Sequence, residues 1–62
     1  MKVYVAYMRW SYYANKFTYE DKVVSIDRMP RSEKEIINLK LKISPEIQKV
    51  SDIVLLNVMK LK

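Results

Sequence analysis

The side chains best suited to contact a partner lie close together at residues 12–16 of this 62-residue chain. Tyr12 and Tyr13 are adjacent, and Asn15 and Lys16 follow them. Tyrosine is a preferred anchor of protein interfaces, and aromatic rings beside cations also stack on single-stranded nucleic acid. The alternative is that the two tyrosines form a hairpin tip with no binding role. We predict that these four residues contact a partner.

A second candidate patch is basic. Lys40 and Lys42 lie in a segment with a helical pattern, and Lys34 and Lys49 flank them. Such a face is usually only solvated, but it can also steer a protein towards an acidic surface or nucleic acid. The formal net charge of +5 favours acidic partners in general. We therefore add Lys40 and Lys42 to the predicted partner-binding residues.

The composition gives little support to enzyme chemistry. Without His, Cys or Gly, the chain lacks the usual general base, thiol nucleophile, soft metal ligands and phosphate-binding loops. Glu20 and Asp21 are neighbours on a predicted strand and should point to opposite faces. Glu33 and Glu35 are better explained by the start of a helix. We expect no catalytic residue, no metal site and no cofactor, and a protein that is not an enzyme.

Two strands joined by a hairpin must position these residues. From Val3 to Trp10 both odd and even positions are apolar, which is typical of a strand covered on both faces. Residues 17–28 form a more polar second strand, which we place at an edge of the sheet. The reversal falls in residues 11–16, in a loop of about four to six residues built around a type I turn. Asn15 is the best candidate for a left-handed conformation there, because the chain has no glycine.

A helix is predicted next. Ser32 and Glu35 have the spacing of a capping box, in which Ser32 accepts from the Glu35 amide and Glu35 from the Ser32 amide. The apolar stripe at helical spacing behind this cap consists of Ile36, Leu39 and Ile43. Residues 39–43 also alternate as a strand would, and this alternative stays open, although the cap favours the helix. Pro45 should end the helix near Ile43.

Residues 52–61 form a third strand that is apolar on both sides. The order of the elements predicts an α+β fold of type ββαβ, in one domain of residues 1–62. The sheet is antiparallel and three-stranded, with strand order 2-1-3 and the helix on one face. The longest apolar run, Ile53–Leu56, is far shorter than the roughly 20 residues of a membrane span. The chain also starts without the form of a signal peptide, so we expect a cytoplasmic protein.

The predicted helix covers only one face of the sheet, so the opposite apolar face must be covered by something else. A chain of this length buries only about 60 % of the surface that its unfolded form exposes, and it has no cysteine for a disulfide. A second copy is the simplest cover, which predicts a homodimer. The sequence does not decide which face dimerises. If the even-numbered side of the first strand does, the interface residues are Tyr4, Met8, Trp10, Leu56 and Val58.

The segments "MKVYVAYM", "SEKEI" and "VSDIVLLNVMKL" together resemble a group of small proteins from phages and mobile elements of low-GC bacteria. That group has a tyrosine-rich first strand, a second strand, a helix opened by Ser and acidic residues, and a last strand reading like "VVILN". Small phage proteins of this kind tend to inhibit bacterial defence systems, as anti-CRISPR proteins and the inhibitor of the Hachiman system do. This chain departs from the group at Pro45 and in lacking the glycine of its hairpin.

The resemblance implies a non-enzymatic, phage-type inhibitor that binds and blocks a bacterial defence protein in the cytoplasm of the host cell. The alternative is a small nucleic-acid-binding phage regulator, which the positive charge would serve. No membrane partner is expected.

Overall fold

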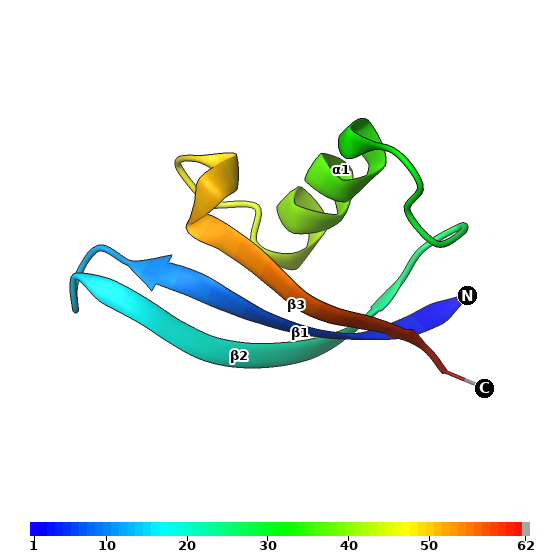
Figure 1. The fold of residues 1–62 in the computed structure, drawn as a ribbon, viewed down its shortest axis with the longest axis horizontal. Helices are drawn as coiled ribbons and strands as arrows, with labels where there is room; N and C mark the ends of the chain where they lie inside the picture. Colours follow the sequence, from blue (N-terminus) through cyan, green and yellow to red (C-terminus); the bar gives the residue numbers. More distant parts are fainter. Residues whose placement is uncertain (62) are drawn as a thin grey trace.

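Three antiparallel strands form a sheet in the order β2-β1-β3, and a helix lies over one face of it (Figure 1). The computed structural model describes residues 1–61. The strands are β1 (Lys2–Ser11), β2 (Lys16–Ser25) and β3 (Ile53–Lys60), and the helices are α1 (Glu33–Ile43) and the short 3-10 helix η1 (Val50–Asp52). The predicted ββαβ fold and the 2-1-3 strand order are confirmed.

The second strand is shorter than predicted. Its last residue, Ser25, pairs with Lys2, the first residue of β1. Ile26 N–H then donates to the Met1 carbonyl at 2.8 Å. The prediction of a strand to residue 28 was wrong, since the pairing with β1 ends at Ser25 and the chain leaves the sheet after Ile26.

The hairpin turns as the sequence predicts. Asn15 has a φ of 57°, the left-handed conformation, and its N–H donates to the Ser11 carbonyl at 2.7 Å. The Ser11 hydroxyl accepts from the Ala14 N–H at 3.1 Å. Asn15 therefore does what glycine usually does in such a turn.

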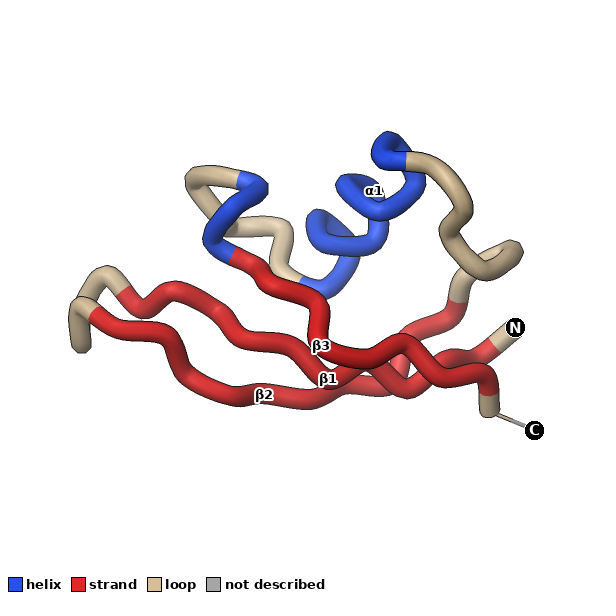
Figure 2. The backbone as a smooth tube through the Cα atoms, in the orientation of Figure 1, coloured by secondary structure: helices blue, strands red, loops and turns tan. Residues whose placement is uncertain are grey.

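Helix α1 begins after the predicted cap Ser32 and ends before Pro45, so residues 39–43 are helical (Figure 2). The Ser32 hydroxyl accepts from the Glu35 N–H at 3.2 Å. The Glu35 carboxylate accepts from Arg28 at 3.0 Å rather than from the Ser32 amide. At the other end, Lys22 reaches across from β2 and its ammonium group donates to the Ile43 carbonyl at 2.9 Å. This contact places a cation at the negative end of the helix dipole.

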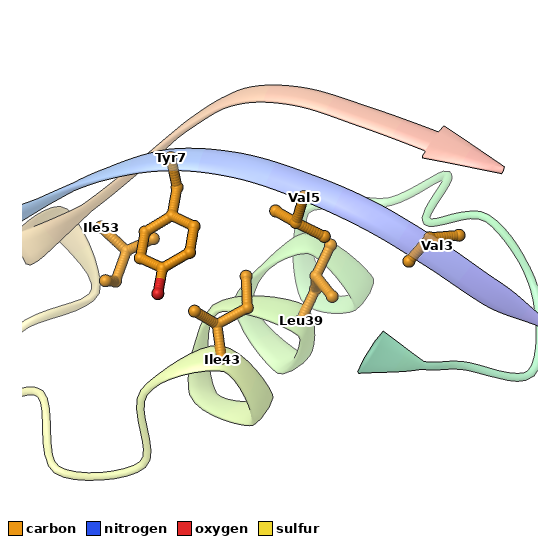
Figure 3. Close-up of a cluster of buried hydrophobic side chains, with 6 residues drawn as sticks. All are labelled: Val3, Val5, Tyr7, Leu39, Ile43 and Ile53. Carbon is orange, nitrogen blue, oxygen red and sulfur yellow. The ribbon is translucent and has the colours of Figure 1, made fainter. Parts of the chain in front are cut away.

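The core lies between the odd-numbered face of β1 and the helix (Figure 3). It consists of Val3, Val5, Tyr7, Leu39, Ile43 and Ile53, all at most 3 % exposed. The even-numbered residues of β1 therefore point away from α1.

A β-bulge in β3 changes which of its side chains face the helix. Ala6 pairs with Asn57 and Tyr7 pairs with Leu55, so Leu56 is an extra residue. The alternation reverses at this point, and Val58 pairs with the buried Val5 and packs against the core. The prediction that Val58 belongs to the sheet face opposite the helix was wrong, because it assumed unbroken alternation.

Candidate interaction surface

The sheet face turned away from α1 is largely apolar, and we call it the open face. Residues directly paired across strands lie on the same face, so the register of β1 identifies its members. They are Lys2, Tyr4, Ala6, Met8 and Trp10 of β1, Phe17, Tyr19, Asp21, Val23 and Ser25 of β2, and Val54, Asn57 and Met59 of β3. Leu56 joins them, because it lines a hollow together with Tyr4 and Ala6.

The open face exposes large apolar side chains. Five of them have exposed fractions between 41 % and 79 %: Phe17, Tyr19, Val23, Leu56 and Met59. Trp10 packs edge-on against Phe17, with ring centroids 5.0 Å apart. Small soluble domains rarely expose a continuous apolar patch unless a partner covers it.

One carboxylate, that of Asp21, lies within the open face opposite Ala6. It accepts a hydrogen bond from the Tyr4 hydroxyl at 3.1 Å. This bond raises the pKa of Tyr4 above its ordinary value of 10.0. The phenol is therefore protonated near neutral pH and can keep donating to Asp21.

The predicted interface residues Tyr4, Met8, Trp10 and Leu56 are thus brought together on one face. The predicted interface did not include Phe17, Tyr19, Val23 and Met59, which lie on the same face. The alternate spacing of Phe17, Tyr19 and Val23 within β2 was the available signal for three of them, but only the register shows that they lie beside Trp10 and Tyr4. Met59 of β3 joins the face because the bulge shifts the alternation of that strand.

The two tyrosines of the hairpin tip have different surroundings. The Tyr12 hydroxyl donates to the two carboxylate oxygens of Asp52 at 2.9 and 2.8 Å. Its ring also lies edge-on to Trp10, at 6.5 Å between centroids. Tyr13 is fully exposed, and its neighbours Asn15 and Lys16 are exposed as well. Tyr12 therefore contributes to the fold although it is 51 % exposed, and Tyr13 is available to a partner.

The Tyr12–Asp52 contact joins the hairpin tip to the start of β3. Asp52 is buried, and its carboxylate also accepts from the Lys49 N–H at 3.2 Å, which caps η1. A buried carboxylate that lost the Tyr12 hydroxyl would be left with fewer hydrogen bonds. The contact thus fixes the segment that leads into β3.

We expect Tyr12→Phe to lower the melting temperature at neutral pH, because the ring remains but the bond to Asp52 is lost. That bond, helped by desolvation, raises the pKa of Tyr12 above 10.0 in the folded state. The hydroxyl therefore stabilises the fold fully below pH 10.0, and its contribution is lost as the pH rises through the folded pKa.

Thermal unfolding from pH 7 to 11 checks this, with Tyr13→Phe as the matched control. The difference between wild type and Tyr12→Phe should be constant below about pH 10 and shrink above it. An unchanged melting temperature for Tyr12→Phe at pH 7 would show that the contact contributes nothing.

Lys40 and Lys42 do not form one patch. Residues two apart on a helix point in nearly opposite directions. Lys40 borders a groove together with Ile36 and Ile53, whereas Lys42 lines a separate hollow with Asp27. The structure therefore separates them.

A polar cluster occupies the helix side of the sheet beyond the core. The Glu20 carboxylate pairs with Arg9 at 2.9 Å and accepts from the Tyr7 hydroxyl at 3.4 Å. Burial, and then the Glu20 charge, raises the pKa of Tyr7 above 10.0. Arg9 also approaches Glu46 at 3.7 Å. These charges are engaged with one another, and we assign the cluster a structural role.

Comparison of the chain with protein-family models, with curated proteins and with solved structures found no match. Within residues 1–61, no helix has the length and hydropathy of a membrane span. The same residues contain no group of three or more acidic side chains placed to share a metal ion.

Proposed function

We propose that this protein is a non-enzymatic, phage-type inhibitor that blocks a bacterial defence protein by covering part of its surface, and that it works as a homodimer in the host cytoplasm. The open face is the observation that carries the proposal, because its apolar side chains need cover. The resemblance to small phage proteins supplies the biological setting. The absence of His and Cys from the sequence supports a binding role over catalysis.

A second copy is the proposed cover of the open face. A standard interface takes about 800 Å² from each partner, which is about a sixth of the accessible surface of 4694 Å². Three adjacent strands of eight to ten residues offer a face of suitable extent. The aromatic and methionine side chains of this face are the types enriched in the centres of interfaces.

With the open face covered, the hairpin tip is the remaining exposed aromatic site. We propose that Tyr13, with Asn15 and Lys16, contacts the host protein. An exposed tyrosine buries a large area on binding at a low cost in side-chain entropy.

The test is capture of a binding protein from bacterial lysate with wild type and Tyr13→Ala, followed by identification of the captured protein. We expect Tyr13→Ala to keep the melting temperature and the dimer but to reduce capture about tenfold or more, as loss of an aromatic anchor does. Tyr12→Phe is the control, because it should lower stability and preserve capture. Undiminished capture by Tyr13→Ala would remove the tip from the proposed site.

Single-stranded nucleic acid is the second candidate partner. The observation in its favour is that Trp10, Phe17 and Tyr19 present rings on an antiparallel sheet of a chain with net charge +5. The charge among these rings is Asp21, however, and Lys2 lies at the far end of the face, opposite Ser25, whereas phosphates would require cations beside the rings. Binding of labelled single-stranded DNA and RNA, with affinity falling steeply as salt increases, would favour this candidate over the inhibitor.

A further inference from the structure

Strand β3 has a free edge. It pairs with β1 on one side and forms the border of the sheet on the other. Leu61 N–H donates to the Lys2 carbonyl at 3.0 Å, so it points towards β1. Because amide directions alternate along an antiparallel strand, the N–H groups of Lys60 and Val58 point away from the sheet. These groups could pair with an added strand.

The two edges of the sheet differ in how they are protected. Proteins commonly place charged side chains on edge strands to prevent pairing with other chains. β2 follows this rule, with Lys16, Glu20, Asp21 and Lys22. In contrast, β3 has no charged residue from Ile53 to Met59. The edge of β3 is therefore open to strand pairing, whereas the charged side chains of β2 disfavour pairing at the other edge.

A groove of about 510 Å³ lies between the first part of this edge, residues 53–55, and α1. Its lining residues are Ile36, Lys40, Ser51, Ile53, Val54 and Leu55. A strand added to β3 would direct alternate side chains towards the helix side, over this groove. Binding of an extended peptide between an edge strand and a helix is a recurring mode of recognition, in which backbone bonds give affinity and pockets give specificity.

The charge of the groove indicates which peptide fits. Lys40 is half-buried, and among residues 1–61 its ammonium group takes part in no ion pair. A cation beside apolar side chains would be stabilised by an acidic group of the ligand. We infer that the β3 edge and its groove bind an extended acidic peptide segment of the partner protein, with apolar side chains at alternate positions. This inference rests on the proposed binding function and adds the chemistry of the partner.

A second copy of the chain fits this edge less well. If two β3 strands paired antiparallel along their whole length, Ile53 would lie opposite Lys60 of the second copy. Lys60 is on the helix side of the sheet, since it pairs with Val3. Its cation would then approach Lys40, which borders the groove at Ile53. Like charges placed together disfavour that assembly.

The probe for the test is a displayed library of random dodecapeptides, selected on the full chain. We expect the selected peptides to share an Asp or Glu and apolar residues spaced two apart. The best peptide, titrated against labelled protein by NMR, should shift the amides of Val58 and Lys60 and leave those of the β2 edge unchanged.

Matched variants locate the site. Lys40→Glu should lower the affinity for the selected peptide about tenfold or more, because repulsion replaces attraction. Lys42→Glu, on the other side of the helix, should change this affinity little. Ile36→Ser should weaken binding more than Leu41→Ser. Lys60→Pro should weaken it more than Lys60→Ala, because proline removes an outward N–H and leaves the bonds to β1 intact.

The inference is overturned if no peptide is selected, if the selected peptides bind the open face, or if Lys40→Glu and Lys42→Glu have equal effects. Should one of these occur while wild type still captures a host protein, the peptide site fails and the proposed function stands. If wild type also captured no host protein, both the peptide site and the proposed function would be wrong.

Discussion

Met8→Asp is expected to convert the proposed dimer into a folded monomer. Met8 lies in the middle of the open face, between Tyr19 on β2 and Val54 on β3. The dimer would bury one unpaired carboxylate from each copy, and each costs several kcal/mol. The dissociation constant should therefore rise at least about a hundredfold. The monomer should keep its fold, because the side chain does not enter the core.

Light scattering at micromolar concentration measures this change. Wild type should have twice the chain mass of 7.5 kDa, and the variant should have the chain mass itself. Trp10, the single tryptophan, should report the same change through its fluorescence as its face becomes exposed. Asn38→Asp, on the exposed side of α1, adds the same charge and should leave the mass unchanged. A dimeric Met8→Asp variant would show that the open face is not the interface.

Ile53→Ala is expected to unfold much of the protein. Ile53 is completely buried at the start of β3, beneath α1. Truncation of a buried isoleucine to alanine costs about 2–5 kcal/mol. A single core of this size supplies no more than about 3–5 kcal/mol of stability. The loss is therefore comparable with the whole free energy of unfolding.

Urea unfolding followed by circular dichroism checks this expectation. Leu41→Ala is the control, since it removes as many methyl groups from a half-exposed position on α1. It should cost little, because alanine also has the higher helix propensity. Equal losses for the two variants would contradict the assignment of the core.

The fold followed from features that act locally or through simple patterns. The apolar runs of the first and third strands placed them together in the sheet, and the Ser32 cap and Pro45 bounded the helix. Asn15 supplied the left-handed residue of a hairpin without glycine. Each of these signals depends on neighbouring residues, so the sequence contains it directly.

The site was less predictable because it depends on contacts between distant residues. Asp52 lies 40 positions from Tyr12, and no local pattern links them. The bulge at Leu56 removes Val58 from the open face, and a strand pattern shows no sign of one extra residue. The prediction of one basic patch grouped Lys40 and Lys42 because they belong to one helix, whereas helical geometry directs residues two apart to different sides.

Contacts between the two copies test the central claim most directly. An isotope-filtered NOE experiment on a mixed sample of labelled and unlabelled protein detects only protons that approach each other across the dimer. If the open face is the interface, intermolecular NOEs should connect Met8, Trp10, Tyr19 and Met59, and no proton of α1 should take part. The absence of intermolecular NOEs at millimolar concentration, or their restriction to α1 and the β3 edge, would contradict the account.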